Sequence, residues 1–179
     1  MLIVVTGSSG KLGRAVVDDL LHHGHEVRAV DVSPRTDGPV STRVADLTAY
    51  EGLEGLMAGA DAVVHLGNYP WFRRVGDPAG FANNTVSTFN VFHAAHAAGV
   101  KRWVNASSIQ AYGVVGKKPS TPAYLPVDED HPLLSRDGYQ VSKVAGELIV
   151  GSFARMDPDL RACSLRLTAI YVADRSNTP

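Results

Sequence analysis

Tyr139 and Lys143 stand four residues apart in a stretch of sequence that we expect to be helical. Side chains at this spacing lie on the same face of a helix, so a lysine ammonium would lie beside a tyrosine hydroxyl. A free phenol titrates near pH 10, and moving its ionisation to about pH 7 requires roughly 4 kcal/mol of differential stabilisation. A cation at about 4 Å, in an effective dielectric near 20, supplies about that amount. The pair can therefore form a tyrosine acid–base group, whereas the spacing taken alone also fits a surface tyrosine beside a helical lysine.

A serine pair, Ser107-Ser108, closes the expected strand 102–106. In doubly wound parallel sheets, ligands bind at the carboxyl edge, where this strand ends. A Ser108 hydroxyl at that edge can hydrogen-bond a substrate oxygen while Tyr139 moves the proton. Ser108, Tyr139 and Lys143 are therefore the candidate catalytic residues.

A glycine-rich turn, Thr-Gly-Ser-Ser-Gly-Lys-Leu-Gly over residues 6–13, connects the first expected strand to the first helix. In a dinucleotide-binding turn, glycines allow the tight bend, the close approach of a pyrophosphate and the packing of helix on strand. The helix N-terminus adds free N–H groups and the positive end of its dipole. We expect cofactor contacts at Gly7, Ser9, Gly10, Lys11, Leu12 and Gly13. Three spaced glycines alone are a weak signal, because turns collect glycine.

An acidic residue, Asp31, ends the second expected strand, where a carboxylate can accept hydrogen bonds from an adenosine ribose. A carboxylate there repels a 2′-phosphate, which favours NAD over NADP. Arg35 could reverse this preference, but we expect a solvated loop arginine. Asp46, with Leu47 beside it, either caps the adenine pocket or begins a turn, and the sequence leaves both interpretations open.

Short β-branched runs alternate with longer helical stretches, a pattern typical of an α/β protein with a parallel sheet. We predict one Rossmann-type, doubly wound domain over residues 1–179, with helices on both faces and strand order 3-2-1-4-5-6. The expected strands are 2–6, 26–31, 42–45, 62–66, 102–106 and 162–167. One helix is expected directly after the glycine turn, and three more are expected at 50–57, 78–98 and 137–154. Gly24 and Gly99 should end the first and third helices, and a long, proline-rich loop should span 113–134.

The chain has 179 residues, 45% of them hydrophobic, and a formal net charge of −1. Its charges are scattered, so nothing supports binding to nucleic acid or to an anionic membrane. The one cysteine, Cys163, cannot form an internal disulfide, and we expect it to be a small buried residue of the sixth strand. No signal peptide or membrane-length apolar run is evident. These features predict a cytoplasmic protein.

With these motifs in this order, the chain resembles the short-chain dehydrogenase/reductase superfamily, in its extended branch of NAD-dependent epimerases and dehydratases. The resemblance rests on the glycine turn, Asp31, the Tyr139/Lys143 pair and four further segments: 65–67 (His-Leu-Gly), 84–91 (Asn-Thr-Val-Ser-Thr-Phe-Asn-Val), 107–113 (Ser-Ser-Ile-Gln-Ala-Tyr-Gly) and 166–167 (Arg-Leu). It implies that Tyr139 is the acid–base residue, and that Lys143 holds the nicotinamide ribose and lowers the pKa of Tyr139. It also implies that Ser108 is the catalytic serine and that further cofactor contacts lie at Leu66, Gly67, Asn84 and Ser107. For Asn84, a plain polar position on a helix is the alternative.

The same resemblance bears on the reaction. Dehydratases of this branch carry an Asp-Glu pair at the positions of Ile109 and Gln110, so dehydration is disfavoured. The leading hypothesis is an NAD-dependent oxidoreductase or epimerase acting on a sugar, a sugar acid or a nucleotide sugar. The alternatives are a non-catalytic NAD(P)-binding module and an inactive truncated fragment.

The resemblance also concerns the C-terminal region and the assembly. Members of this branch continue into a C-terminal substrate-binding region, which we expect to be largely absent here. The helices 78–98 and 137–154 resemble those that form the dimer interface in this superfamily, so we expect a homodimer.

The histidines 22, 23 and 25 could suggest a metal by their spacing, but we expect a solvated helix end there. His93 and His96 have no nearby carboxylate or cysteine, so no metal is predicted. Trp71 and Phe72 either line the substrate site or pack locally. Arg73 and Arg74 either bind an anionic substrate or are solvated.

Overall fold

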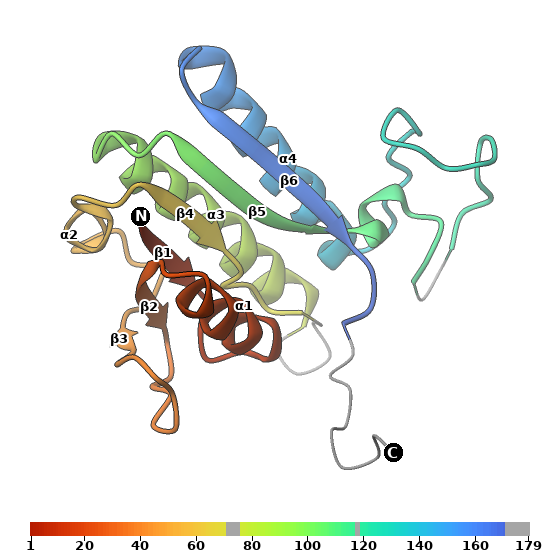
Figure 1. Ribbon diagram of the computed structural model, residues 1–179. Helices are drawn as coiled ribbons and strands as arrows, with labels where there is room; N and C mark the ends of the chain where they lie inside the picture. The colour runs from red at the N-terminus through yellow and green to blue at the C-terminus, as the bar shows by residue number, and fades with distance from the viewer. Residues whose placement is uncertain (71–75, 117–118, 171–179) are drawn as a thin grey trace.

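The computed structural model describes residues 1–70, 76–116 and 119–170. A parallel six-stranded sheet lies at its centre in the order β3-β2-β1-β4-β5-β6, which confirms the predicted topology (Figure 1). The strands are β1 (Leu2–Thr6), β2 (Glu26–Asp31), β3 (Arg43–Val44), β4 (Ala62–His65), β5 (Arg102–Ser108) and β6 (Arg161–Leu167). The helices are α1 (Lys11–His22), α2 (Leu53–Met57), α3 (Asp77–Ala97), the 3-10 turn η1 (Ile109–Tyr112) and α4 (Gly138–Met156).

Two hydrophobic clusters cover the two faces of the sheet. On one face, Val17 and its neighbours from α1 pack against Ile3 and Val5 of β1. On the other face, α2, α3 and α4 cover Val4 and Trp103, and Trp103 stacks on Phe92 of α3 with ring centroids 4.8 Å apart. Burial of each such large side chain contributes roughly 1.5–3 kcal/mol. Because side chains alternate along a strand, the apolar run in β1 supplies both clusters.

The element boundaries follow the sequence closely, with one difference that matters for the site. Gly24 and Gly99 follow α1 and α3 with φ of 75° at each, the left-handed geometry expected after a helix. The predicted fifth strand stops at residue 106, whereas β5 continues to Ser108. Parallel pairing with β6 continues through Ser108, opposite Leu167, and it holds both serines in the sheet. Their positions are therefore set by strand pairing rather than by a loop.

Cys163 is exposed, so the prediction that it is buried is wrong. Strand pairing places Cys163 beside Val104, and Val104 beside Val64, which packs against the α1 cluster. Cys163 therefore lies on the same face of the sheet as α1, but at the far edge. In Figure 1, α1 stands over β1 and β2, whereas no helix of the described chain stands over β6 on that side.

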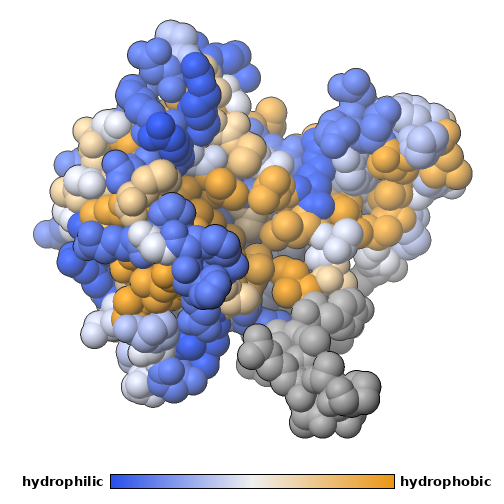
Figure 2. Space-filling view, in the orientation of Figure 1, coloured by the Kyte–Doolittle hydropathy of each residue, from blue (hydrophilic) through white to orange (hydrophobic). Residues whose placement is uncertain are grey.

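The described residues of the long connection between η1 and α4, 113–116 and 119–137, form no helix or strand, as predicted. It begins at Gly113, with φ of 73°, where an added Cβ would come within 2.0 Å of the Leu134 carbonyl oxygen. The loop is fastened at its base, since the Leu134 amide donates to the Tyr112 carbonyl. Figure 2 shows apolar residues on its surface, and Leu125 is 77% exposed.

Two remaining predictions concern metals and aromatic side chains. Among the described residues, no group of three or more His, Cys, Asp or Glu side chains could hold a metal ion. The candidate substrate-lining residues Trp71, Phe72, Arg73 and Arg74 lie outside the described ranges. In those ranges, no helix is both long enough and apolar enough to cross a membrane.

Candidate functional site

A cavity of about 840 Å³ lies along the carboxyl ends of the strands. It extends from Asp31, at the end of β2, to Tyr139 on α4 and Ile170 after β6. Fourteen of the predicted site residues line it: Gly7, Gly10, Lys11, Leu12, Gly13, Asp31, Asp46, Leu47, Leu66, Gly67, Ser107, Ser108, Tyr139 and Lys143. Ser9 and Asn84 are absent from the lining. One cavity thus brings together the glycine turn and the candidate catalytic residues.

The glycine turn leaves no room for side chains at two of its positions. Gly7 has φ of 68°, and a Cβ there would approach the Gly67 nitrogen to 2.7 Å. At Gly13, a Cβ would approach the Gly7 carbonyl oxygen to 2.0 Å. Both contacts are with backbone, which cannot move aside cheaply. Glycine at these positions is what lets α1 begin directly against the end of β1, with its N-terminus at the cavity.

The Asp31 carboxylate is held in place at the β2 end of the cavity. Its Oδ2 accepts from the Ser9 amide at 3.0 Å, and its Oδ1 accepts from the Ser33 amide at 3.0 Å. Each carboxylate oxygen can accept a second hydrogen bond, so Asp31 is available to a diol such as a ribose. Ser9 acts through Asp31, and its hydroxyl donates to the Ser33 carbonyl.

Arg35 does not line the cavity. The prediction that it is a solvated loop arginine is wrong. Its side chain is only 12% exposed, and its Nη1 pairs with Asp18 at 3.0 Å. Asp18 and Asp37 both raise the pKa of Arg35, and the hydrogen bond that Arg35 donates to Asp18 is the largest cause. Asp46 accepts hydrogen bonds from the Thr48 amide and hydroxyl, which confirms the turn, and it also lines the cavity. Its place at an adenine pocket stays a prediction.

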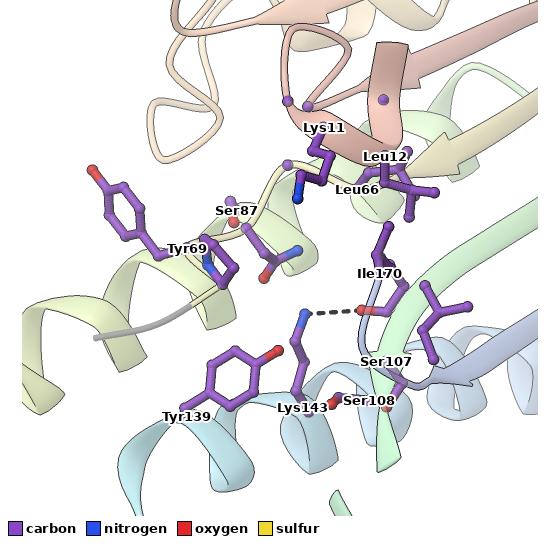
Figure 3. Close-up of a pocket in the computed structure, with 18 of the residues that line it drawn as sticks. Lys11, Leu12, Leu66, Tyr69, Ser87, Ser107, Ser108, Tyr139, Lys143 and Ile170 are labelled. Atoms are coloured by element: carbon purple, nitrogen blue, oxygen red, sulfur yellow. Dashed lines mark hydrogen bonds between the residues drawn. The ribbon is translucent and has the colours of Figure 1, made fainter. Parts of the chain in front are cut away.

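At the other end of the cavity, α4 presents Tyr139 and Lys143 together. Figure 3 shows both side chains extending from α4 toward the cavity, with Lys11 and Leu12 on the opposite wall. The Lys143 Nζ lies 5.6 Å from the centre of the Tyr139 ring and donates to the Ala106 carbonyl at 2.9 Å. Ser108 is hydrogen-bonded to the Tyr139 hydroxyl. The three candidate catalytic residues therefore meet at one point.

The protonation of this pair differs from what the resemblance implies. Burial lowers the pKa of Lys143 to about 8. Burial also raises the pKa of Tyr139, and this effect outweighs the Ser108 hydrogen bond, which lowers it. In the chain by itself the pKa of Tyr139 is therefore raised, and its lowering by Lys143 stays a prediction for the cofactor-bound chain. The physical reason is that desolvation disfavours the charged form of both groups.

A buried histidine that the sequence analysis did not single out for chemistry supports the floor of the cavity. His65, at the end of β4, bonds to the hydroxyls of Thr6 at 2.7 Å and Thr88 at 3.0 Å. Thr6 in turn accepts from the amides of Leu66 and Gly67, two cavity residues. Burial first, and the charge of Lys143 second, lower the pKa of His65 to about 3. His65 is therefore neutral at physiological pH.

Asn84 is neither a cavity contact nor a plain polar helix position. It is fully buried on α3, and its amide pairs with both the N–H and the C=O of Tyr69, at 2.8 and 3.1 Å. Asn84 thus fixes the segment after β4, where Asn68 and Tyr69 line the cavity. Other lining residues that the sequence analysis missed are Asn83, Ser87, Gln110, Val115, Gly116 and the segment 167–170. The spacing of four between Asn83 and Ser87 is the one signal that could have indicated a polar face of α3.

A glycine turn at the head of a parallel doubly wound sheet, with an acidic residue after the second strand, defines a dinucleotide-binding α/β protein of the Rossmann type. The chain belongs to the NAD dependent epimerase/dehydratase family, whose model matches residues 3–178. This confirms the resemblance drawn from the motifs, and the family description names the predicted cofactor.

Three known proteins illustrate the relationship. The UDP-glucose 4-epimerase of Mycolicibacterium smegmatis is 31% identical over 87% of this chain and 52% of its own length. The 3-beta-hydroxysteroid dehydrogenase of Mycolicibacterium neoaurum is 31% identical over 94% of this chain and 47% of its own. A short-chain dehydrogenase/reductase superfamily protein from Agrobacterium tumefaciens, crystallised with NAD, is 36% identical with a TM-score of 0.80, over 93% of this chain and 48% of that one. The chain thus spans about half the length of the relatives that it matches.

Proposed function

We propose that this chain provides the NAD-binding and catalytic half of an enzyme that oxidises or epimerises a hydroxyl-bearing carbon of a sugar-type substrate. One observation carries the proposal: the glycine turn and Asp31 stand at one end of the same cavity that holds Ser108, Tyr139 and Lys143 at the other. A cofactor bound along this cavity would place its reactive end beside the tyrosine. A dinucleotide-binding module without catalysis does not need this second cluster.

The residues present fit NAD. Glycine at positions 7 and 13 lets α1 begin directly against the end of β1, so that the N-terminus of α1 can receive a pyrophosphate at the cavity. Asp31, already oriented by two backbone amides, would accept hydrogen bonds from the hydroxyls of the adenosine ribose and would repel a 2′-phosphate. Lys143 would hold the second ribose. When bound, NAD⁺ supplies a hydride acceptor and a positive ring charge near the tyrosine.

The side chains of α4 and β5 would then move the proton. Tyr139 Oη takes the hydroxyl proton of the substrate as the carbon is oxidised, and Ser108 orients the oxygen that loses it. The positive charge of Lys143 favours the ionised tyrosine, against the burial that raises its pKa. The site residues Ile109 and Gln110 cannot exchange a proton, so water elimination is not proposed.

The lining near Tyr139 favours a polyhydroxylated substrate over a steroid. Asn83 and Ser87 from α3, Ser108 from the end of β5 and Gln110 from η1 supply amide and hydroxyl groups to the cavity. Such groups are left unpaired by an apolar ring system, at a cost of about 1–3 kcal/mol each when buried. A sugar, sugar acid or nucleotide sugar would pair with them.

The first experiment is a calorimetric titration of the chain with NAD and, separately, with NADP. We expect saturable binding with NAD tighter, and tighter NADP binding would overturn the role given to Asp31. Turnover of a panel of nucleotide sugars, uronic acids and a 3β-hydroxysteroid is then compared between the chain and its Tyr139→Phe variant. The variant should bind NAD normally and lose turnover. If the chain binds NAD but turns over no substrate of the panel, a non-catalytic NAD-binding module becomes the better interpretation of its function.

We also propose that the chain forms a homodimer through α3 and α4. An apolar groove runs between these helices, and Phe89, Leu148 and Met156 on it are 46%, 63% and 69% exposed. A two-fold axis would place each groove against its copy and cover these side chains. Light scattering should give a dimer mass for the chain and a monomer mass for Leu148→Glu. A monomeric parent chain, or a dimeric variant, would contradict this interface.

A further inference from the structure

A carboxylate that takes no part in the proposed reaction lies one helical turn beyond Lys143. Glu147 of α4 has a side chain that is 15% exposed, and it accepts a hydrogen bond from the Ser107 hydroxyl. The Arg166 guanidinium of β6 grips it with two hydrogen bonds, Nε to Oε1 at 3.0 Å and Nη2 to Oε2 at 2.8 Å. Such a two-point grip fixes the carboxylate in orientation as well as in position.

Glu147 belongs to a row of three side chains on α4. Tyr139, Lys143 and Glu147 follow at intervals of four residues, so they lie along one side of the helix. Each meets the end of β5: Tyr139 at Ser108, Lys143 at the Ala106 carbonyl, and Glu147 at the Ser107 hydroxyl. Glu147 therefore anchors the residue that directly precedes the candidate catalytic serine.

Through Arg166, the same carboxylate connects β5 to two other walls of the cavity. Arg166 pairs with Ser107 in the strand register, and the cavity-lining segment 167–170 begins directly after it. Its guanidinium lies 4.5 Å from the centre of the Tyr112 ring and donates to the Glu129 carbonyl in the long loop at 3.1 Å. The hydrogen bonds that Arg166 donates to Glu147 are the largest cause that raises the pKa of Arg166, which keeps the arginine charged.

We propose that Glu147 is a positioning residue, which holds the end of β5 so that the Ser108 hydroxyl stays against Tyr139. The inference deepens the proposed function, because it gives Glu147 a role in the same proton-transfer site. Glu147 does not touch the reacting atoms, and it acts through Ser107 and Ser108. The Arg166 partner makes the anchor rigid by tying it to β6 and to the long loop.

The direction of one measurable change separates positioning from a plain charge effect. Glu147→Gln removes a negative charge, and by Coulomb's law alone this change would lower the pKa of Tyr139. If Glu147 instead positions Ser108, the substitution weakens the Ser108 hydrogen bond that lowers this pKa, and the pKa rises. We expect a rise of about one pH unit, comparable to one hydrogen bond to a charged group.

The test is a pH-jump titration of tyrosinate absorbance, which needs neither cofactor nor substrate and so does not depend on the proposed activity. The chain has six tyrosines, so each variant is measured against the same variant carrying Tyr139→Phe. Asp157→Asn is the matched control, because Asp157 directly follows α4 and its ion pair with Lys101 lies at the opposite end of β5. Ser107→Ala is the second test variant, which removes the anchored hydroxyl and leaves the Glu147–Arg166 pair in place.

A higher Tyr139 midpoint in Glu147→Gln, with no shift in Asp157→Asn, supports the proposal. Ser107→Ala should shift the midpoint in the same direction by less, and it gives the answer if Glu147→Gln does not fold. An unchanged or lower midpoint in the folded test variants overturns the positioning role. NAD binding by the same variants is measured separately, so a failure of the cofactor proposal is seen independently.

Discussion

Replacing Lys143 by Met should make the chain more stable at neutral pH, although Lys143 is a candidate catalytic residue. The lysine is buried, with 6% of its surface exposed, and its ammonium donates to the neutral Ala106 carbonyl at 2.9 Å. Burial lowers its pKa from the ordinary value of 10.5 to about 8. The folded state therefore disfavours the charged form that exists at neutral pH.

The size of the effect follows from that pKa. The difference between 10.5 and about 8 corresponds to about 3 kcal/mol of unfavourable burial at neutral pH. Methionine fills a similar space without a charge, and loss of the Ala106 hydrogen bond offsets about 1 kcal/mol. The expected net gain is about 2 kcal/mol, or roughly 4–8 °C in Tm for a chain of this length.

The gain should depend on pH in a defined direction. Because the folded pKa lies below the unfolded one, the unfolded chain binds more protons between about pH 8 and pH 10.5. The stability contributed at this position in the parent chain therefore rises with pH across that window, while Lys143→Met lacks this dependence. The difference between the two proteins should be full at about pH 7 and should shrink toward about pH 10.

Urea unfolding followed by circular dichroism at these two pH values measures the difference directly. Lys101→Met is the matched control, because Lys101 is 46% exposed and forms an ion pair with Asp157, so its removal should bring no gain. A Lys143→Met variant that is less stable than the parent chain at neutral pH would refute the reasoning. A gain that stays constant between the two pH values would also refute it.

Three further substitutions test the cavity. Gly13→Ala should abolish NAD binding and lower the free energy of unfolding by about 3 kcal/mol or more, because the added Cβ would lie 2.0 Å from the Gly7 carbonyl oxygen. Gly55→Ala is the control, since its Cβ meets nothing within 4 Å and the substitution should be neutral or stabilising. Calorimetric titration measures NAD binding, and thermal unfolding measures the stability of both variants. Asp31→Asn should weaken NAD binding about tenfold and raise the NADP-to-NAD affinity ratio, and parallel titrations with the two cofactors would show an unchanged ratio if Asp31 does not face the ribose. The pKa of His65 in the folded chain is about 3, against an ordinary value of 6.5. As the pH falls between these values, His65 is protonated in the unfolded chain but not in the folded one, so the stability of the fold decreases. His65→Asn should flatten this acid dependence, which urea unfolding at several pH values measures.

Most of the fold could be predicted because its signals are local. The apolar run of β1 and the glycines after α1 and α3 fix the type and the ends of elements from neighbouring residues alone. The extension of β5 through Ser108 could not be predicted in this way, because pairing with Leu167 of β6 decides it. The predicted burial of Cys163 was wrong for a related reason. An apolar residue type favours burial, but whether a position is buried depends on which element covers it.

In the candidate site, too, contacts between residues close in sequence could be predicted, and contacts between distant residues could not. Tyr139 and Lys143 are close in sequence, so their spacing alone indicated a shared face. Glu147 and Arg166 meet across 19 residues, and His65 meets Thr88 across 23, so nothing local marks these pairs. Asn84 has the expected residue type, but its amide pairs with the backbone of Tyr69, a contact that appears only when α3 is placed against the end of β4.

The polar residues on the inner side of α4 differ in a way that itself indicates function. Glu147 is paired with Arg166 and Ser107, so its burial is compensated. Lys143 has been moved out of water beside a neutral carbonyl, and the folded chain would be more stable with an apolar residue in its place. Uncompensated burial of this kind concentrates at functional sites, where stability is given up for chemistry. A Lys143→Met chain that unfolds at higher urea concentration but binds NAD more weakly would place Lys143 in that class.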